Sequence, residues 1–219
     1  MELDNRMLTE ASKRLISDCL ARYPVINLCL EQVKDAFFIL RQTFVSGGKL
    51  LVCGNGGSAA DAEHICGELM KGFLKKRRLA EELIERIRKL AGQVEWVEQL
   101  QGSLQVIPLT SNTALISAIC NDLSADQIFA QQVLGYGNVN DALLAISTSG
   151  RSTNVIRAVI IAKSIGLKTI GLTGNSGGSF QEFCNVTIQA PADETHRIQE
   201  LHLPIYHLLS AMLEEELFD

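Results

Sequence analysis

Short apolar segments alternate with helical patterns along most of the chain. Apolar runs bounded by small or polar residues predict five β-strands, at 49–53, 104–109, 141–147, 168–173 and 185–190. The segments between them carry apolar residues three and four positions apart. This spacing predicts helices at about 59–72, 113–119, 126–136 and 153–165, and a last one over 194–217.

This alternation is typical of the α/β class. Parallel strands need crossover connections, and right-handed crossovers place helices on both faces of the sheet. We therefore expect a doubly wound three-layer sandwich around a five-stranded parallel sheet, of the flavodoxin-like kind. Two amphipathic helices, over 4–22 and 25–46 and separated at Pro24, are predicted before the first strand.

Residues 75–101 interrupt this rhythm with a dense run of charges. Apolar residues recur within the segment at helical spacing, as at Leu79, Leu83 and Ile87. We interpret the chain, 1–219, as a single domain with an N-terminal helical extension (1–46) and a helical insertion (75–101). The insertion is either a solvated helix packed by one apolar stripe, or a flap or subunit contact near the site.

Composition narrows the classes of function. The net charge of −5 argues against a nucleic-acid or anionic-membrane surface. The start, MELDNRM, lacks the apolar stretch of a signal peptide, and no uncharged apolar run could span a bilayer. Six cysteines without a C-x-x-C pair indicate a reducing compartment, so we expect a cytoplasmic protein with no nucleic-acid or membrane partner.

Small hydroxyl- and amide-bearing residues follow the predicted strands. The first strand is followed by Asn55, Gly56, Gly57 and Ser58, and the third by a Ser-Thr-Ser-Gly-Arg-Ser run at 147–152. Glycines let backbone N–H groups approach an anion, and helix N-termini add partial positive charge, so these loops predict a phosphate or polyol site. A P-loop is excluded because no Lys follows the glycines, and a dinucleotide fingerprint lacks its acidic partner. The alternative is that these residues only make tight turns.

The helix after the first loop carries a candidate acid–base group. His64 and Glu68 are four residues apart and therefore share a helical face. Gln199 and His207 lie on the last helix and could reach the same cavity. The alternative is that His64 is an ordinary core or surface histidine. Ser58 and Asp61 have the spacing of a capping box at the start of the first of these helices.

Four segments resemble the sugar isomerase (SIS) domain, and within it the phosphoheptose isomerases. These are CGNGGSAADAEHICGEL, AISTSGRSTNVIRA, GLTGNSGG and HRIQELHLPIYH, in family order. The resemblance implies interconversion of sedoheptulose 7-phosphate and a glycero-manno-heptose 7-phosphate through an enediol or enediolate. It also implies a homotetramer with active sites at subunit contacts.

The resemblance further implies residue roles. Glu68 and His207 match the catalytic acid–base pair, and Asn55 and Asp122 match residues that contact the sugar chain. The glycine loop, Gly56 and Gly57, and Gln199 are assigned to substrate binding with the phosphate-binding hydroxyls of Ser58, Ser147, Thr148, Ser149 and Ser152. Zinc is implied at His64, Glu68, Gln199 and His207. The sequence departs from the family pattern at His196 and Gly72, where the family commonly has Asp and Arg.

Three functions are compatible with these residues. The first is an aldose–ketose isomerase acting on a phosphorylated sugar. The second is a non-catalytic member of the same fold that binds a replication initiator, and the third is a sugar-phosphate sensor. Glu68 and His207 are both present, which favours the enzyme, because proton transfer between adjacent carbons needs an acid–base pair.

Overall fold

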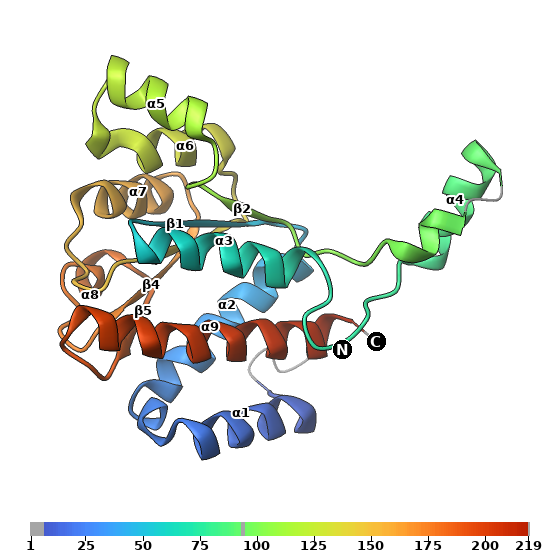
Figure 1. Cartoon of the computed structure of the whole chain (residues 1–219), viewed down its shortest axis with the longest axis horizontal. Helices are drawn as coiled ribbons and strands as arrows, with labels where there is room; N and C mark the ends of the chain where they lie inside the picture. The colour runs from blue at the N-terminus through green and yellow to red at the C-terminus, as the bar shows by residue number, and fades with distance from the viewer. Residues whose placement is uncertain (1–6, 93–94, 219) are drawn as a thin grey trace.

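A five-stranded parallel sheet forms the centre of the protein (Figure 1). The computed structural model describes residues 7–92 and 95–218. The sheet order is β2-β1-β3-β4-β5, and every pair is parallel. All five predicted strands are confirmed, as β1 (Leu50–Gly54), β2 (Val106–Pro108), β3 (Ala142–Ile146), β4 (Lys168–Gly174) and β5 (Val186–Ala190).

The strand order places the topological switch between β1 and β3. From β1 the chain passes to the edge strand β2 and then returns to β3, on the other side of β1. Strands β1 and β3 remain paired up to their carboxyl ends, where Gly54 lies opposite Ile146. Connections on the two sides of a switch diverge, and the crevice between them lies at the carboxyl ends of the strands. The loops with the predicted anion-binding residues, after β1 and β3, therefore flank this crevice.

Two apolar layers cover the two faces of the sheet. Successive side chains of a strand point to opposite faces, so Leu50 and Val52 join one cluster while Leu51 and Cys53 join the other. The first cluster packs against α2 (Leu30–Val45), α3 (Gly57–Met70) and α9 (Thr195–Leu217). The second packs against α6 (Ile128–Tyr136), α7 (Thr153–Ser164) and the short α8 (Phe180–Phe183). The predicted three-layer sandwich is confirmed.

The N-terminal helices pack beside α9 (Figure 1). Helix α1 (Glu10–Arg22) begins after Thr9, whose hydroxyl accepts from the Ser12 N–H. The predicted helix is therefore wrong at residues 7–9, and its residues 4–6 lie outside the described chain. The helix predicted from 25 begins as the 3₁₀ helix η1 (Pro24–Cys29) before α2. Helix α5 (Thr113–Asp122) and η3 (Ala125–Gln127) adjoin α6.

The charged insertion projects away from the sandwich (Figure 1). Its described residues form α4 (Glu81–Ala91) and the 3₁₀ helix η2 (Glu95–Gln99), with 93–94 outside the described residues. The base of the insertion is fixed to the domain by Arg77, which is fully buried and pairs with Glu214 of α9. Within residues 7–92 and 95–218, no helix has the length and apolar character that crossing a membrane requires.

Candidate active site

Helix α3 starts at the carboxyl end of β1 through a glycine turn. Gly56 has φ +56°, which favours glycine, and it precedes the first helical residue. The predicted capping box is wrong, because no side chain caps α3. Ser58 is buried in the first turn, and Asp61 accepts a hydrogen bond from Tyr206 of α9 instead of capping.

Hydroxyl and amide groups connect the loops on the two sides of the switch. The side-chain amides of Asn55 and Asn154 exchange two hydrogen bonds of 2.9 Å, which joins the loop after β1 to α7. The Ser147 and Ser152 hydroxyls lie 3.0 Å apart. Beside them, at the ends of β3 and β4, is a hollow of about 330 Å³. Its lining includes Thr148, Ser149, Arg151, Gly174, Asn175 and Thr195.

Helices α3 and α9 lie side by side and run in the same direction (Figure 1). At their N-terminal ends the Gln199 amide packs against Gly57, where an added Cβ would lie 2.4 Å from Nε2. Two turns further along, the Nε2 atoms of His207 and His64 are 3.5 Å apart. The two helices therefore share one seam, with the loop residues at its start and both imidazoles further along.

His64, Glu68 and His207 converge on one point of this seam. His64 Nε2 lies 3.0 Å from Glu68 Oε1, and one potential ligand atom from each of the three residues lies within 4.8 Å of the others. Two imidazoles and a carboxylate form a donor set that suits zinc with a further position open to substrate. The structure thus brings together three of the four predicted metal ligands. Gln199 faces Gly57, and its ligand role stays a prediction.

The environment of the cluster favours the neutral form of the His207 imidazole. Burial lowers the pKa of His207, and the neighbouring His64 lowers it further, while Glu68 acts in the opposite sense. A neutral imidazole retains the lone pair that a metal or a proton requires. Glu68 is half-buried at the same point, and its Oε1 faces His64, which leaves the second carboxylate oxygen for proton transfer.

Two residues at the site, Tyr206 and Asp61, were not predicted from the sequence as functional. The Tyr206 hydroxyl lies 3.0 Å from His64 Nδ1 and 3.2 Å from Asp61 Oδ1. Burial raises the pKa of Asp61, and burial together with Asp61 raises that of Tyr206. A Tyr beside His207 in an apolar helix has the pattern of a core residue, so only the packing of α3 on α9 shows its partners.

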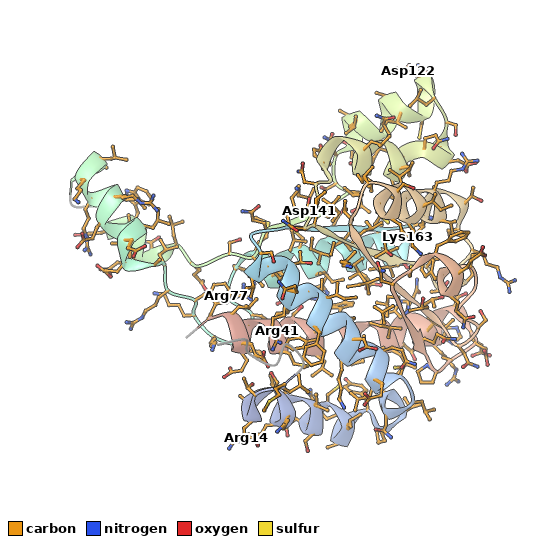
Figure 2. All side chains as sticks on the ribbon, turned by 180° about the vertical axis from the view of Figure 1, so that it is seen from behind. Arg14, Arg41, Arg77, Asp122, Asp141 and Lys163 are labelled. Atoms are coloured by element: carbon orange, nitrogen blue, oxygen red, sulfur yellow. The ribbon has the colours of Figure 1, made fainter. Side chains whose placement is uncertain are left out.

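Three other residues singled out from the sequence are not members of the cluster. Asp122 is exposed at the carboxyl end of α5, remote from the buried ion pair of Arg77 (Figure 2). His196 is exposed and lies 3.7 Å from Glu194. A side chain at Gly72 would meet the Lys75 carbonyl oxygen at 2.3 Å, so the base of the insertion leaves no room there for the family's arginine.

The fold and the site define a sugar isomerase domain, and the SIS domain family matches residues 25–113 and 104–174. A phosphoheptose isomerase from Rhodospirillum rubrum is 35% identical across 92% of this chain and 93% of its own length. The phosphoheptose isomerase structures from Neisseria gonorrhoeae and Francisella tularensis superimpose with TM-scores of 0.72 and 0.73, at 31% and 32% identity. They cover 91% and 93% of this chain, and 95% of each structure is matched. The chain belongs to the phosphoheptose isomerase family of SIS-domain proteins.

Proposed function

We propose that this protein is an aldose–ketose isomerase that interconverts sedoheptulose 7-phosphate and a glycero-manno-heptose 7-phosphate. The observation that carries the proposal is the convergence of His64, Glu68 and His207 on the seam whose start bears the hydroxyl loops. Family membership supports the same reaction. An acid–base group and an anion-binding loop on one pair of helices suit a substrate with a carbonyl at one end and a phosphate at the other.

The spacing along α3 supports a long sugar phosphate. Ser58 and His64 are six residues apart, which corresponds to about 9 Å along the helix axis at ~1.5 Å per residue. An extended seven-carbon chain can bridge this length. In this arrangement the phosphate lies at the N-termini of α3 and α7, where backbone N–H groups and hydroxyls bind anions. Carbons 1 and 2 then reach the cluster.

Isomerisation needs two proton movements between adjacent carbons. From the ketose, the Glu68 carboxylate takes a proton from C1, which gives the enediol or enediolate, and the proton is returned at C2. The O1 hydroxyl proton passes to O2, for which the His207 imidazole is the adjacent acid–base group. A divalent cation such as zinc, held by His64, Glu68 and His207, would polarise the carbonyl and stabilise negative charge on the two oxygens. No outside oxidant is required, since the same electrons move within the substrate.

The test is NMR of sedoheptulose 7-phosphate incubated with the protein in D₂O, with and without zinc. We expect aldose product and solvent deuterium at the exchanging carbon. Glu68→Gln keeps the size of the side chain but removes its basicity, and it should abolish exchange. Ser58→Ala should raise KM with a smaller change in kcat, because its hydroxyl is assigned to phosphate binding rather than proton transfer.

The alternative functions predict different outcomes of this experiment. If the wild-type protein exchanges no proton in any five- to seven-carbon ketose phosphate, the isomerase proposal is wrong. Binding of the sugar phosphate without exchange would then favour a sensor. Recovery of a replication initiator in a pull-down, again without exchange, would favour the binding protein.

Self-association is part of the same proposal, with a homotetramer as the expected state. The expected sugar-binding role of Asp122 supports it. Asp122 lies far from Arg77, a neighbour of Glu68, in its own chain (Figure 2), so that role would require another copy. Sedimentation velocity at micromolar concentration tests the assembly, and a stable monomer would contradict it. The six free thiols of the described chain suit a reducing compartment, and a cytoplasmic location completes the proposal.

A further inference from the structure

Tyr206 contacts two residues of the candidate site through one hydroxyl. Its oxygen lies 3.2 Å from Asp61 Oδ1 and 3.0 Å from His64 Nδ1, and its side chain is almost completely buried. The second carboxylate oxygen of Asp61 is also buried and has no hydrogen-bond partner among the described residues. The Asp61 side chain thus accepts its only side-chain hydrogen bond in the described chain from Tyr206, whose own side chain is shielded from water.

The number of protons in this chain of groups determines the direction of each bond. A tyrosine hydroxyl has one proton, and an ionised carboxylate can only accept. Tyr206 therefore donates to Asp61, and its oxygen accepts from His64. When the His64 imidazole carries a single proton, this geometry places it on Nδ1 and leaves a lone pair on Nε2.

The exposed lone pair of Nε2 then faces other acceptors. Nε2 lies 3.0 Å from Glu68 Oε1 and 3.5 Å from His207 Nε2. Acceptors that face one another at this distance repel, and a cation bound between them removes that repulsion. The opposite tautomer would place a proton on Nε2, donate it to Glu68, and occupy the position that a cation needs.

The ring of Tyr206 orients the same histidines by packing. It makes edge-on contacts with His64 and His207, with ring centroids 5.4 and 5.1 Å away. A phenylalanine could retain both ring contacts but not the two hydrogen bonds. The hydroxyl and the ring of Tyr206 can therefore be separated by one substitution.

We propose that Tyr206, hydrogen-bonded to Asp61, is a positioning residue that holds His64 in the Nδ1–H tautomer and so sets the affinity of the His64–Glu68–His207 cluster for a divalent cation. The inference deepens the proposed function, on which it rests for the role of the cation. Hydrogen-bond partners behind metal-binding histidines fix the tautomer and orientation of the ring. Here that partner is a tyrosine, with the carboxylate one step further away.

The first measurement is long-range ¹H–¹⁵N NMR of the metal-free, full-length protein with ¹⁵N-labelled histidine. His64 is assigned as the resonance lost in His64→Gln. We expect Nδ1–H in the wild-type protein and a shift toward Nε2–H in Tyr206→Phe. The second measurement is Co²⁺ affinity, by absorption with a competing chelator, and Tyr206→Phe should bind about 10- to 100-fold more weakly.

Tyr136→Phe is the matched control, because it removes a hydroxyl from a half-buried residue of α6, away from the site. It should change neither the tautomer nor the Co²⁺ affinity. If Tyr206→Phe does not fold, Asp61→Asn tests the same chain of bonds, with the same direction and a smaller loss. Thermal unfolding establishes that each variant is folded.

The proposal is wrong if His64 is Nε2–H in the wild-type protein, or if folded Tyr206→Phe keeps the Nδ1–H form. It is also wrong if that variant binds Co²⁺ within twofold of wild type, or if the wild-type protein binds none. These outcomes need no turnover. A protein that isomerises no sugar phosphate but shows the expected tautomer and Co²⁺ affinities would overturn the proposed function and leave the role of Tyr206 intact.

Discussion

Replacing Arg77 with methionine should destabilise the protein more than any surface substitution. The Arg77 and Glu214 side chains are 0% and 2% exposed, and Nε lies 2.7 Å from Oε1. The guanidinium also donates to the backbone carbonyls of Leu69 and Glu68, at 2.6 and 3.0 Å. One side chain thus joins the end of α3, which carries Glu68, to α9 and to the base of the insertion (Figure 2).

The expected loss of unfolding free energy follows from the Glu214 carboxylate, which would lose its ion-pair partner. Removing one member of a buried ion pair costs about 3–5 kcal/mol, because the other charge stays buried. Glu214 would still accept from the backbone N–H groups of Phe73, Leu74 and Lys75, at 2.7, 2.7 and 3.1 Å. These bonds place the expected cost near the lower limit, at about 3 kcal/mol. For a chain of this size that lowers Tm by roughly 6–12 °C.

The assay is urea unfolding of wild type, Arg77→Met and Arg78→Met at one fixed protomer concentration, because assembly alters apparent stability. Arg78 is the exposed neighbour, and its loss should change the free energy of unfolding by no more than about 0.5 kcal/mol. The double variant Arg77→Met/Glu214→Leu should recover part of the loss, since no buried charge remains. If Arg77→Met lowers the free energy of unfolding by less than about 1 kcal/mol, the reasoning that it leaves the Glu214 charge buried without its ion-pair partner is wrong.

Three further predictions concern α3 and the end of α9. Gly57→Ala should raise KM for the sugar phosphate in a kinetic assay with little loss of stability, because the new Cβ displaces only the flexible Gln199 side chain, 2.4 Å away. Gly67→Ala has open space and should stabilise α3 by about 0.5–1 kcal/mol in urea unfolding, and a loss instead would mean that this face is covered. Burial raises the pKa of Glu216, but hydrogen bonds from Arg41 and Ser12 outweigh it and hold the pKa below its usual value. The stabilisation from ionised Glu216 is therefore complete above the unfolded pKa of about 4.3 and is lost as the pH falls through the folded pKa. Glu216→Gln should thus weaken the fall in the free energy of unfolding between pH 5 and 3, measured by urea unfolding at each pH.

Strands and crossover helices were predictable because their signals are local. Each strand is a short apolar run between turn residues, and each predicted strand lies within two residues of the observed one at either end. The insertion was less predictable. One helical stripe was expected over 75–101, whereas the described residues form α4 and η2, since a projecting segment lacks the long-range packing that would extend a single helix.

For the site, the sequence alone determined which residue types follow each strand and that His64 and Glu68 share a helical face. It therefore indicated the anion-binding loops and half of the acid–base group. Only the tertiary structure decided that α9 runs parallel to α3, which brings His207 to His64 and Tyr206 to Asp61 across more than 140 residues of chain. The physical reason is that local patterns specify elements and their buried faces, whereas contacts between elements depend on how those faces pack around the shared core.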